Sequence, residues 1–474
     1  MTLSRAPSTV LHTASDLGHV REVMSTCPQP LRKLVAAAVS GCLLACSSGA
    51  APTASPVRDA GAAADLATGR AANGGCPSEL DAAQCMGLSA LIQPLALPPA
   101  LGNASADDDD AAVLGFQIFF DIRFSRGRKV RCESCHSVDY AFADNAQVPT
   151  LGLGPGVRNS PTVLNAARHT IFMWDGRADT LWSQPLLAFE NPDEMGFTRL
   201  EIAHTLQAFY ASMYQRAFGP LPDFSDRARF PAAGMPGDAA FDAMRPEDQR
   251  VVDQTVANVG KALEAYMRKL ATGPSRVDRY LASLFDADPG YPPLKSNTPV
   301  EQLLSAEEQR GAVVFARSGC LACHSGSQLS DDQFHDLGVP ALPGHAPDPG
   351  RTPAVVELLA SSPFNASGVF FEGTPGATPP PAAAAGAFRT PSLRNLTRSR
   401  PYGHNGVFAS LEDVVDFHLA GGGQDPDGLL GEVDPLLRPQ QLSAADRAAL
   451  IAFLKALDGM YPALPWGQWP SGNG

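Results

Sequence analysis

Hydrophobic side chains recur at helical spacing in four stretches of the chain, at residues 113–127, 307–319, 410–422 and 442–459. The apolar positions of the last stretch are Leu450, Phe453, Leu454 and Leu457. Their spacing of three and four places them on one face of a helix, and Ser443 ahead of them is a residue type that caps a first turn. Strand patterns are sparse. The chain is therefore predicted to be mainly α-helical, with long loops that use its 43 glycines and 42 prolines.

The stretch 410–422 carries a histidine within its apolar pattern. Leu411, Val415 and His418 fall at positions i, i+4 and i+7, with Val414 completing the face. His418 is thus predicted on the buried side of a short helix. A histidine in such a place is more often a core residue than a metal ligand, and the pattern alone leaves both interpretations open.

The start of the chain looks like an export signal. Arg32 and Lys33 precede the short apolar stretch 34–45, which is too short to span a bilayer and fits a secretory signal. Its ending, "LLAC", resembles the bacterial lipobox, which implies cleavage before Cys46 and a lipid on its sulfur. A cleaved signal without lipid is the alternative. Because the segment ahead of the basic pair is long, Met24 is an alternative start.

The rest of the N-terminal region reads as a tether. Residues 47–74 are mostly Ala, Gly, Pro, Ser and Thr, with few large apolar groups, and cannot bury enough apolar surface to fold. We therefore assign 1–45 to the signal and 46–109 to a lipid-anchored tether and N-terminal segment. In an oxidising envelope, Cys76 and Cys85 are expected to form a disulfide. We expect "GTPGATPPPAAAAGA" (373–387) to be a flexible insertion without chemistry.

Charge and hydropathy argue against nucleic acid as a partner and against a membrane-spanning helix after the signal. The formal net charge of −13 argues against nucleic acid, which selects for basic patches. No other stretch is long and apolar enough for a membrane helix, so contact with a membrane is expected only through the lipid anchor.

Two Cys-x-x-Cys-His units carry the chemistry. They are Cys132, Cys135 and His136 in "RCESCHS", and Cys320, Cys323 and His324 in "GCLACHS". Covalent haem c needs two thiols at this spacing and an imidazole beneath the iron, which the next residue supplies. A zinc site would require a second Cys or His pair nearby, which neither unit has. The sequence thus predicts two c-type haems, with both histidines as proximal ligands.

Several further motifs resemble the bacterial dihaem cytochrome c peroxidase family, including its MauG-like branch, over residues 110–460. They are "RNSPTVLNAA" (158–167), "FMWDGRADTLWSQPLLAFENPDEMGF" (172–197), "ALEAYMRKLATGPSRVDRYL" (262–281), "DDQFHDLGVP" (331–340) and "FRTPSLRNLTRSRPYGHNG" (388–406). The resemblance implies an all-α fold of two cytochrome c-like domains with long Gly/Pro loops. It implies a peroxidatic domain over 110–290 and an electron-transfer domain over 291–474, with one haem each.

The resemblance also implies roles for single residues. Trp174 matches a tryptophan that lies between the haems as an electron conduit. Gln184 matches an active-site glutamine, and Glu194 matches the distal glutamate that acts as acid and base on peroxide. Taken alone, such a Trp is more often a packing residue and such a Glu a solvated one. In the same way, Asn159 matches the side-chain ligand of a calcium ion, and Ser399 and Pro401 match positions that give it backbone carbonyls.

The two haems are expected to differ in their distal ligands. The family places the distal ligand of the second haem fourteen residues after the His of "YGHNG", where this chain has His418, so a bis-histidine second haem is expected. In the loop 149–159, relatives can carry a distal histidine for the first haem, but this chain has none, and the position falls near Leu151. An open first haem is therefore expected, with His169 as the rival ligand. His335 and His404 remain unassigned.

The resemblance implies an oxidoreductase of the cytochrome c peroxidase type, which reduces hydrogen peroxide to water with electrons from an external donor through the second haem. The alternatives are a MauG-like oxidase that uses peroxide to modify a partner protein and a dihaem electron carrier without catalysis. The expected donor is a small redox protein, a cytochrome c or a cupredoxin. The expected location is the bacterial periplasm, as a membrane-anchored lipoprotein, and relatives are often homodimers.

Overall fold

The computed structural model describes residues 75–147, 152–292, 299, 302–374, 381–423, 430–463 and 465–468. The predicted signal, the lipidated Cys46 and the tether up to residue 74 lie outside this part of the chain. The described residues all belong to one compact unit, Gly69–Gly474. Among them, no helix has the length and apolar character needed to cross a membrane.

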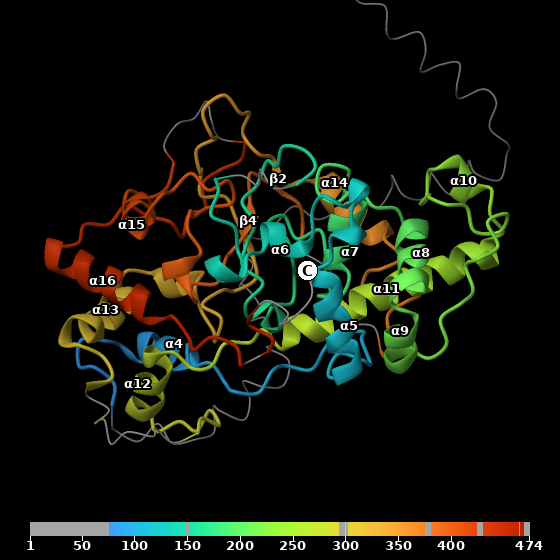
Figure 1. Ribbon diagram of the computed structural model, residues 1–474. Helices are drawn as coiled ribbons and strands as arrows, with labels where there is room; N and C mark the ends of the chain where they lie inside the picture. Colours follow the sequence, from blue (N-terminus) through green and yellow to red (C-terminus); the bar gives the residue numbers. More distant parts are fainter. Residues whose placement is uncertain are drawn as a thin grey trace, which may run out of the picture. The chain divides into compact units, whose positions relative to one another are not determined.

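The described part of the chain is mainly helical, as predicted (Figure 1). Its α-helices are α4 (Ala82–Ala90), α5 (Asp109–Phe119), α6 (Cys132–Cys135), α7 (Gln184–Glu190), α8 (Arg199–Phe209), α9 (Ala211–Phe218), α10 (Ala239–Asp242), α11 (Pro246–Arg268), α12 (Arg276–Leu284), α13 (Ala306–Arg317), α14 (Pro353–Ser361), α15 (Leu411–Leu419) and α16 (Ala444–Ala456). The strands are two residues long: β1 (Phe334–His335) pairs with β4 (Phe388–Arg389), and β2 (Gly350–Arg351) pairs with β3 (Ala384–Ala385), both antiparallel.

Three of the four predicted helices are confirmed, with capping residues that explain where they begin. The Ser305, Ser410 and Ser443 side chains each accept a hydrogen bond from the backbone N–H three residues on, which opens α13, α15 and α16. For α13 and α15 the third residue is acidic and bonds back, which completes a capping box.

The prediction of a helix over 113–127 was wrong in its second half. The helix α5 ends at Phe119 and is followed by two short 3₁₀ turns, Ile122–Phe124 and Arg126–Arg128. The Asp121 side chain accepts from the Arg123 backbone N–H and pairs with its guanidinium, which offers the chain an alternative to helical hydrogen bonding. The apolar spacing alone did not reveal this competition.

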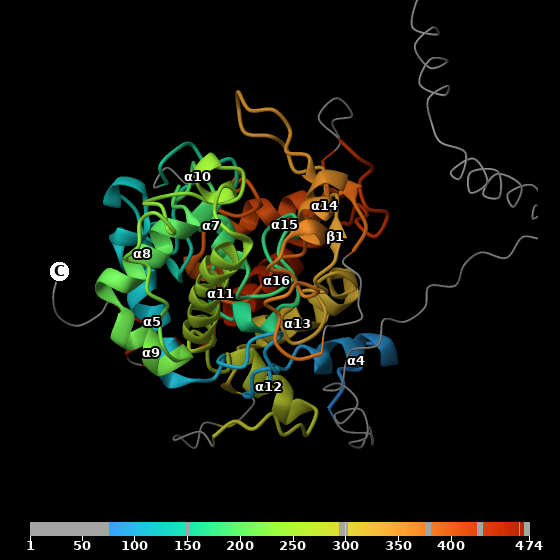
Figure 2. The same ribbon diagram turned by 90° about the vertical axis from the view of Figure 1, so that its right-hand side faces the viewer.

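Buried hydrophobic side chains form two main clusters, each built around a pair of packed helices. In the first cluster α5 packs against α11, and in the second α13 packs against α16 (Figures 1 and 2). In each pair, a glycine lies where the two helices come closest. A Cβ added at Gly115 would lie 2.0 Å from the Ala262 carbonyl oxygen, and one at Gly311 would lie 2.0 Å from that of Ala449. The helices therefore touch backbone to backbone in both clusters.

Segments from each half of the chain also cross to the other cluster. Phe364 and Phe370 follow α14 late in the sequence, yet both belong to the first cluster. The early helix α4 instead contacts α13, and its Leu88 is buried in the second cluster. The boundary predicted near residue 290 stays a prediction, because these crossings tie the two sets of side chains together.

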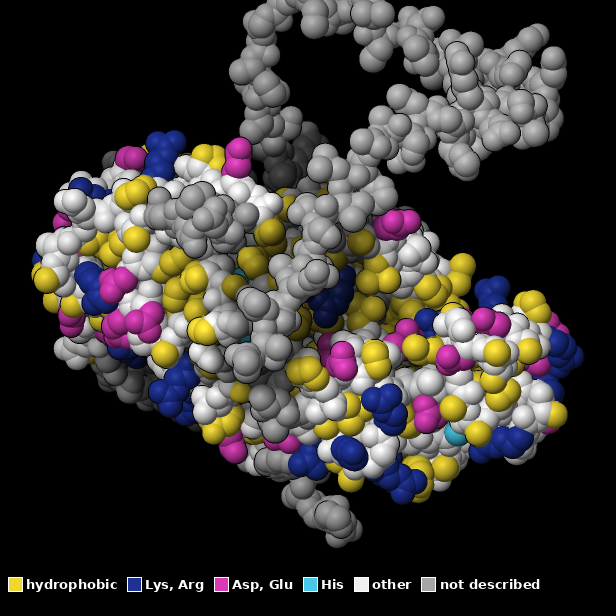
Figure 3. Space-filling view, turned by 90° about the horizontal axis from the view of Figure 1, so that it is seen from above, with side chains coloured by type: hydrophobic (Ala, Val, Ile, Leu, Met, Phe, Trp, Pro, Cys, Tyr) yellow, Lys and Arg dark blue, Asp and Glu magenta, His cyan; other side chains and the backbone are white. Residues whose placement is uncertain are grey.

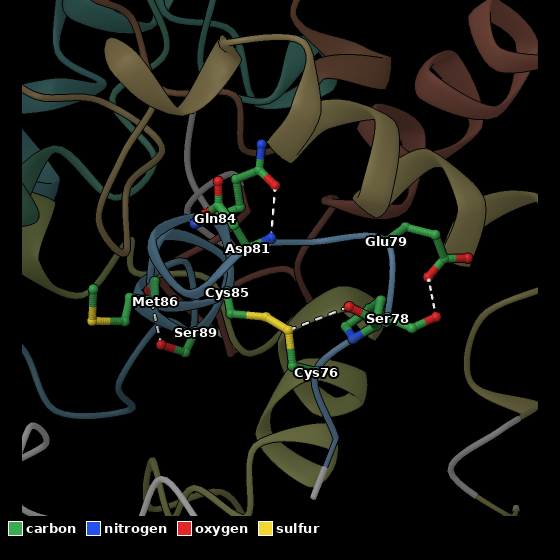
Figure 4. Close-up of a disulfide and its surroundings, with 9 residues drawn as sticks. Cys76, Ser78, Glu79, Asp81, Gln84, Cys85, Met86 and Ser89 are labelled. Atoms are coloured by element: carbon green, nitrogen blue, oxygen red, sulfur yellow. Dashed lines mark hydrogen bonds between the residues drawn. A yellow bond between two sulfur atoms is a disulfide. The ribbon is translucent and has the colours of Figure 1, made fainter. Parts of the chain in front are cut away.

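The N-terminal segment is held by a disulfide and by three arginines. The expected Cys76–Cys85 bridge is present and closes the turn in front of α4 (Figure 4). Further on, Arg394 donates to the Leu91 carbonyl, Arg168 to those of Leu95 and Ala96, and Arg268 to that of Pro98. Because these arginines come from distant parts of the chain, residues 91–98 form a strap across the fold.

The predicted flexible insertion 373–387 is ordered where the structure describes it. Residues 384 and 385 form β3, and the carbonyls of Pro381 and Ala382 accept hydrogen bonds from Arg351. Arg351 is fully buried and also donates to the Asp175 carbonyl in the first half of the chain. The small residues of this Pro-rich segment therefore let its backbone carbonyls come close to the buried Arg351 guanidinium. The composition alone did not indicate this contact.

Replacing Gly311 with Ala is expected to lower the free energy of unfolding by about 1–3 kcal/mol, because the new methyl group forces α13 away from the Ala449 carbonyl. Urea denaturation followed by circular dichroism measures the loss. Glu307→Ala, at an exposed position of the same helix, serves as the control and should change stability by no more than about 0.5 kcal/mol. Equal stability of the two variants would contradict the close contact.

Candidate functional site

Both Cys-x-x-Cys-His motifs open into one cavity of about 720 Å³. Its lining includes the predicted site residues Cys135, His136, Cys320, Cys323, His324, His418, Trp174, Gln184, Glu194, Asn159, Ser399 and Pro401. Cys132 packs against the first hydrophobic cluster beside it. On the face drawn in Figure 3, hydrophobic side chains gather around a hollow that also holds a basic side chain. The structure thus brings every predicted site residue to one region.

The two motif histidines are held in the same way. The Nδ1 atom of His136 lies 3.2 Å from the Phe142 carbonyl oxygen, and that of His324 lies 2.9 Å from the Leu329 carbonyl oxygen. A carbonyl can only accept, so each Nδ1 carries the hydrogen and each Nε2 keeps its lone pair for a metal. This is the tautomer that a proximal haem ligand needs.

His418 is prepared in the same manner on α15. Its Nδ1 lies 2.8 Å from the Val414 carbonyl oxygen, one helical turn back, which again leaves Nε2 as the ligand atom. Burial lowers the pKa of His418, and it lowers that of His324 to about 4, with the nearby His418 adding to the shift. Both rings are therefore neutral at physiological pH and share one site, as a pair of axial ligands requires.

The motif cysteines also fit covalent haem. All four are free thiols, partly buried at the edge of the cavity, and only short helical turns (α6 and Cys320–Ala322) separate the members of each pair. Two thiols, a neutral imidazole with a free Nε2 and an adjoining apolar cavity are together the donor set that haem c requires.

Glu194 and Gln184 face the cavity near the first motif. The Asn191 side-chain amide donates to Glu194 Oε1 at 2.8 Å and so fixes the carboxylate at the end of α7. Gln184 begins α7, and its Nε2 lies 3.5 Å from Met173 Sδ, a weak acceptor. The Gln184 amide thus remains available for a stronger partner. Asn191 and Met173 were not predicted from the sequence.

The loop that lacks a histidine lies against the segment that carries Glu194. The backbone N–H of Leu153 donates to the Glu194 carbonyl, and that of Gly154 donates to the Asp193 carbonyl. A Cβ at Gly152 would lie 2.6 Å from the Asp193 carbonyl oxygen, so a side chain there would force the two backbones apart. Position 151, where relatives were expected to carry the ligand, lies outside the described residues.

Trp174 and His404 meet at the centre of the site. Their ring centroids are 6.5 Å apart, and His404 stacks on Phe388 at 3.6 Å. The Asn159 backbone N–H donates to the His404 carbonyl at 2.7 Å, and the Arg389 N–H donates to the Trp174 carbonyl at 2.8 Å. The Trp174 indole N–H completes the arrangement with a 2.8 Å bond to the Asn159 carbonyl.

These contacts are reciprocal because the chain repeats itself. The segments "NAARHTIFMWDG" (165–176) and "NLTRSRPYGHNG" (395–406) align at an offset of 230 residues. Each contains a left-handed asparagine and a 3₁₀ turn, and each is closed by a backbone bridge, Phe172 to Ala178 or Tyr402 to Phe408. At this offset Trp174 corresponds to His404, and Asn159 to Arg389. Comparing the two motifs would have revealed this repeat from the sequence.

The same offset exposes a difference between the two halves. It places Ala188 of α7 at the position of His418 of α15. Both residues line the cavity. A methyl group cannot bind a metal, so the first half offers no ligand at the point where the second half offers an imidazole.

His169 is engaged in a charged cluster. Its Nδ1 lies 2.7 Å from Asp332 Oδ1, and Arg389 Nη1 binds the same oxygen at 2.9 Å. Burial alone would raise the pKa of Asp332, but the two basic groups hold it below its usual range. The cluster joins the two halves of the chain and gives His169 a structural partner. Asp332 and Arg389 lie within the quoted motifs 331–340 and 388–406, but nothing in those motifs indicated that either residue pairs with His169.

His335 is paired on both ring nitrogens. Its Nε2 lies 3.0 Å from Asp331 Oδ2 and its Nδ1 lies 2.6 Å from Asp434 Oδ2. The contact with Asp331, a contact with the free Cys323 thiol and the contact with Asp434, in that order, raise the pKa of His335 to about 11. An imidazolium has no lone pair for a metal, so His335 is a charged neighbour of the second motif.

The proposed calcium ligands line the same cavity. Asn159 is buried, and its amide nitrogen donates to Asp144 Oδ1 at 3.0 Å and to the Ala146 carbonyl at 2.8 Å. Because both hydrogens point to these acceptors, the amide oxygen is the atom left for a cation. Ser399 and Pro401 line the same cavity and come shortly before His404 in the sequence.

Comparisons with known proteins agree with this geometry. Residues 109–284 match the family model described as di-haem cytochrome c peroxidase. The methylamine utilization protein MauG of Methylorubrum extorquens is 30% identical over 404 residues, which cover 84% of this chain and 92% of that protein. The cytochrome c551 peroxidase of Pseudomonas aeruginosa is 29% identical over 365 residues, which cover 76% and 81%.

Solved structures share the fold. A MauG-like protein associated with microbial copper homeostasis matches with a TM-score of 0.54 and 24% identity, over 79% of this chain and 97% of that one. The diheme peroxidase BthA from Burkholderia thailandensis matches with a TM-score of 0.53 and 22% identity, over 77% and 93%. Two haem-binding motifs around one cavity, and relatives that match along most of their length, show that the chain belongs to the di-haem cytochrome c peroxidase family of oxidoreductases, which implies two haem c groups.

Proposed function

We propose that this peroxidase reduces hydrogen peroxide to water at its first haem and receives electrons from an external donor through its second. The observation that supports this division most strongly is the contrast between Ala188 and His418 at equivalent positions of α7 and α15. It leaves room for an oxidant beside the first motif and closes the second with imidazoles on both sides.

Bound haem supplies the iron at which the O–O bond breaks. The protein's part is acid–base work on peroxide. Glu194 takes the proton from the peroxide oxygen that lies nearer the haem and gives it to the other peroxide oxygen, which leaves as water. Asn191 keeps the carboxylate in place for both transfers, and the Gln184 amide orients the peroxide. In total, hydrogen peroxide takes up two electrons and two protons and gives two water molecules.

Trp174 is proposed to conduct electrons between the haems. It lines the shared cavity, and two hydrogen bonds fix it: its indole N–H donates to the Asn159 carbonyl, and its own carbonyl accepts from the Arg389 N–H. A fixed ring at the meeting point of the two halves favours constant electronic coupling.

The partners and location follow the sequence. We propose a small periplasmic redox protein, a cytochrome c or a cupredoxin, as donor. Export and lipidation at Cys46 would hold the enzyme at a membrane as a lipoprotein, and a homodimer is compatible with the relatives. The acidic balance of −13 favours a donor with a basic docking face.

A second candidate is a MauG-like oxidase that uses peroxide to modify a partner protein. Its support is the 30% identity to MauG, together with His418, which occupies the position where members of this family often carry a Met ligand for the second haem. Such an enzyme would consume peroxide with little oxidation of reduced cytochromes. An electron carrier without catalysis is the third candidate, and the pocket around Glu194 counts against it.

Glu194→Gln is expected to lower peroxide-dependent oxidation of a reduced cytochrome c roughly 100-fold or more, because the amide cannot carry the proton. Stopped-flow absorbance of the holoprotein measures it, and the haem bands at rest should stay unchanged. Asp193→Asn, which alters the adjacent exposed carboxylate, should retain full turnover.

Three outcomes are decisive. Full turnover of Glu194→Gln would refute the role of this residue. Peroxide consumption by the unaltered enzyme without cytochrome oxidation would favour the MauG-like function. A ferric protein that does not react with peroxide at all would favour the carrier.

His418→Met is expected to raise the midpoint potential of the second haem, on the order of 0.1 V, because a thioether stabilises ferrous iron better than an imidazole. Redox titration followed by absorbance gives the potential, and low-temperature electron paramagnetic resonance shows which haem changed its ligands. His345→Met, at an exposed histidine, should leave both potentials unchanged. An unaltered second haem in His418→Met would show that another residue binds there.

We also propose that one calcium ion binds at Asn159, Ser399 and Pro401. Removing it with a chelator should lower the melting temperature and slow electron transfer between the haems, since Asn159 also holds Trp174 and His404. Calorimetry and single-turnover kinetics test this, and added Ca²⁺ should restore both. The variant Asn159→Leu should no longer respond to the chelator, and an unaltered response would remove Asn159 from the site.

A further inference from the structure

A second set of aromatic rings, separate from Trp174, connects the first haem-binding motif with a solvent-facing part of the chain. Its inner member is Tyr266 on α11, which has no exposed surface. Burial raises the pKa of Tyr266, and the nearby sulfur of Cys132 adds to the shift. Cys132 packs against the same cluster. The phenol is therefore a neighbour of the first motif and plays no part in the mechanism above.

The outer member is Trp466. Its ring centroid lies 6.3 Å from that of Tyr266, and the Tyr266 hydroxyl donates to the Trp466 carbonyl at 3.1 Å. Phe116 contacts both rings, at 5.3 Å and 5.8 Å. Trp466 is only partly buried, and the Lys269 ammonium lies 6.0 Å above it, paired with the highly exposed Asp109. The pair thus spans the distance from the buried motif to water.

The chemistry of the two side chains differs in one respect. An oxidised phenol must lose its proton, but among the described residues the hydroxyl of Tyr266 bonds to the Trp466 carbonyl alone, and a carbonyl is not a base. Oxidation therefore does not come to rest at Tyr266. The indole of Trp466 can release its N–H proton to water, and the adjacent ammonium favours that loss. When electrons are taken from Tyr266 and Trp466, the electron deficit should therefore end on the Trp466 indole.

We propose that Trp466 is an oxidation site of this enzyme, and that it supplies electrons to the first haem through Tyr266 when peroxide arrives without a donor. The step rests on the proposed reaction of peroxide at the first haem. The indole gives up two electrons and two protons and gains one oxygen from water. Peroxide takes up those electrons and protons and becomes two waters. The net change is one indole C–H converted to C–OH and one peroxide converted to water.

The test uses the holoprotein with hydrogen peroxide and no donor, without dissolved oxygen, in water labelled with heavy oxygen. Peptide mass spectrometry should find Trp466 hydroxylated with the heavy isotope from the solvent. Trp182, which is fully buried, should remain unmodified. Met460 is exposed and reacts with peroxide directly, so its oxidation confirms equal exposure in every sample.

Two variants isolate the path. Tyr266→Phe keeps the ring packing but removes the oxidisable phenol, and should lower the heavy-oxygen mark on Trp466 several-fold while the haems react with peroxide as before. Trp466→Phe should slow the return of the haem absorbance to its resting form. Haem absorbance at rest reports whether each variant folds and carries both haems.

The outcomes separate this inference from the proposed function. Unchanged haem absorbance on adding peroxide would overturn the proposed function itself. Haems that react while Trp466 stays unmodified would overturn only the inference. Oxygen derived from peroxide in place of water would do the same, because it would show direct attack at the surface. If Trp466 gained as much heavy oxygen in Tyr266→Phe as in the unaltered protein, Tyr266 would not lie on the path.

Discussion

Two backbone hydrogen bonds hold the centre of this enzyme together. The Asn159 N–H binds the His404 carbonyl, and the Arg389 N–H binds the Trp174 carbonyl. Because the four residues are equivalent in pairs at an offset of 230, the same bond is made twice, once from each half. The arrangement is self-complementary, as in a symmetric dimer interface, but it lies within one chain. It sets the position of Trp174 in the cavity that both haem-binding motifs line.

On this repeated frame, single side chains give the two halves different chemistry. The proximal histidines keep identical contacts to backbone carbonyls, so the difference lies on the opposite side of each haem site. One position is Ala188 and its equivalent is His418, while Glu194 and Asn191 belong to the first half only. In the proposed function, these few differences on a repeated scaffold separate oxidant binding from electron entry.

The sequence predicted the helices with strong apolar spacing, because burial of one face dominates their stability. It also identified both haem motifs and the Cys76–Cys85 disulfide, since their chemistry depends on fixed spacings. It failed where contacts are distant in sequence. The early end of α5 depends on a local competition at Asp121, and the order of residues 381–387 depends on Arg351. The His169–Asp332–Arg389 cluster consists of ordinary residues whose meaning appears only when the fold brings them together.

The crossing of Phe364 and Phe370 into the first cluster has a consequence for how the chain reaches its native state. As the polypeptide emerges from N-terminus to C-terminus, the early half lacks two of its own core rings until residue 370 is free. Its apolar surface stays incompletely covered during that interval. The halves cannot then mature one after the other as independent units, and they are expected to acquire their final packing in a single cooperative event.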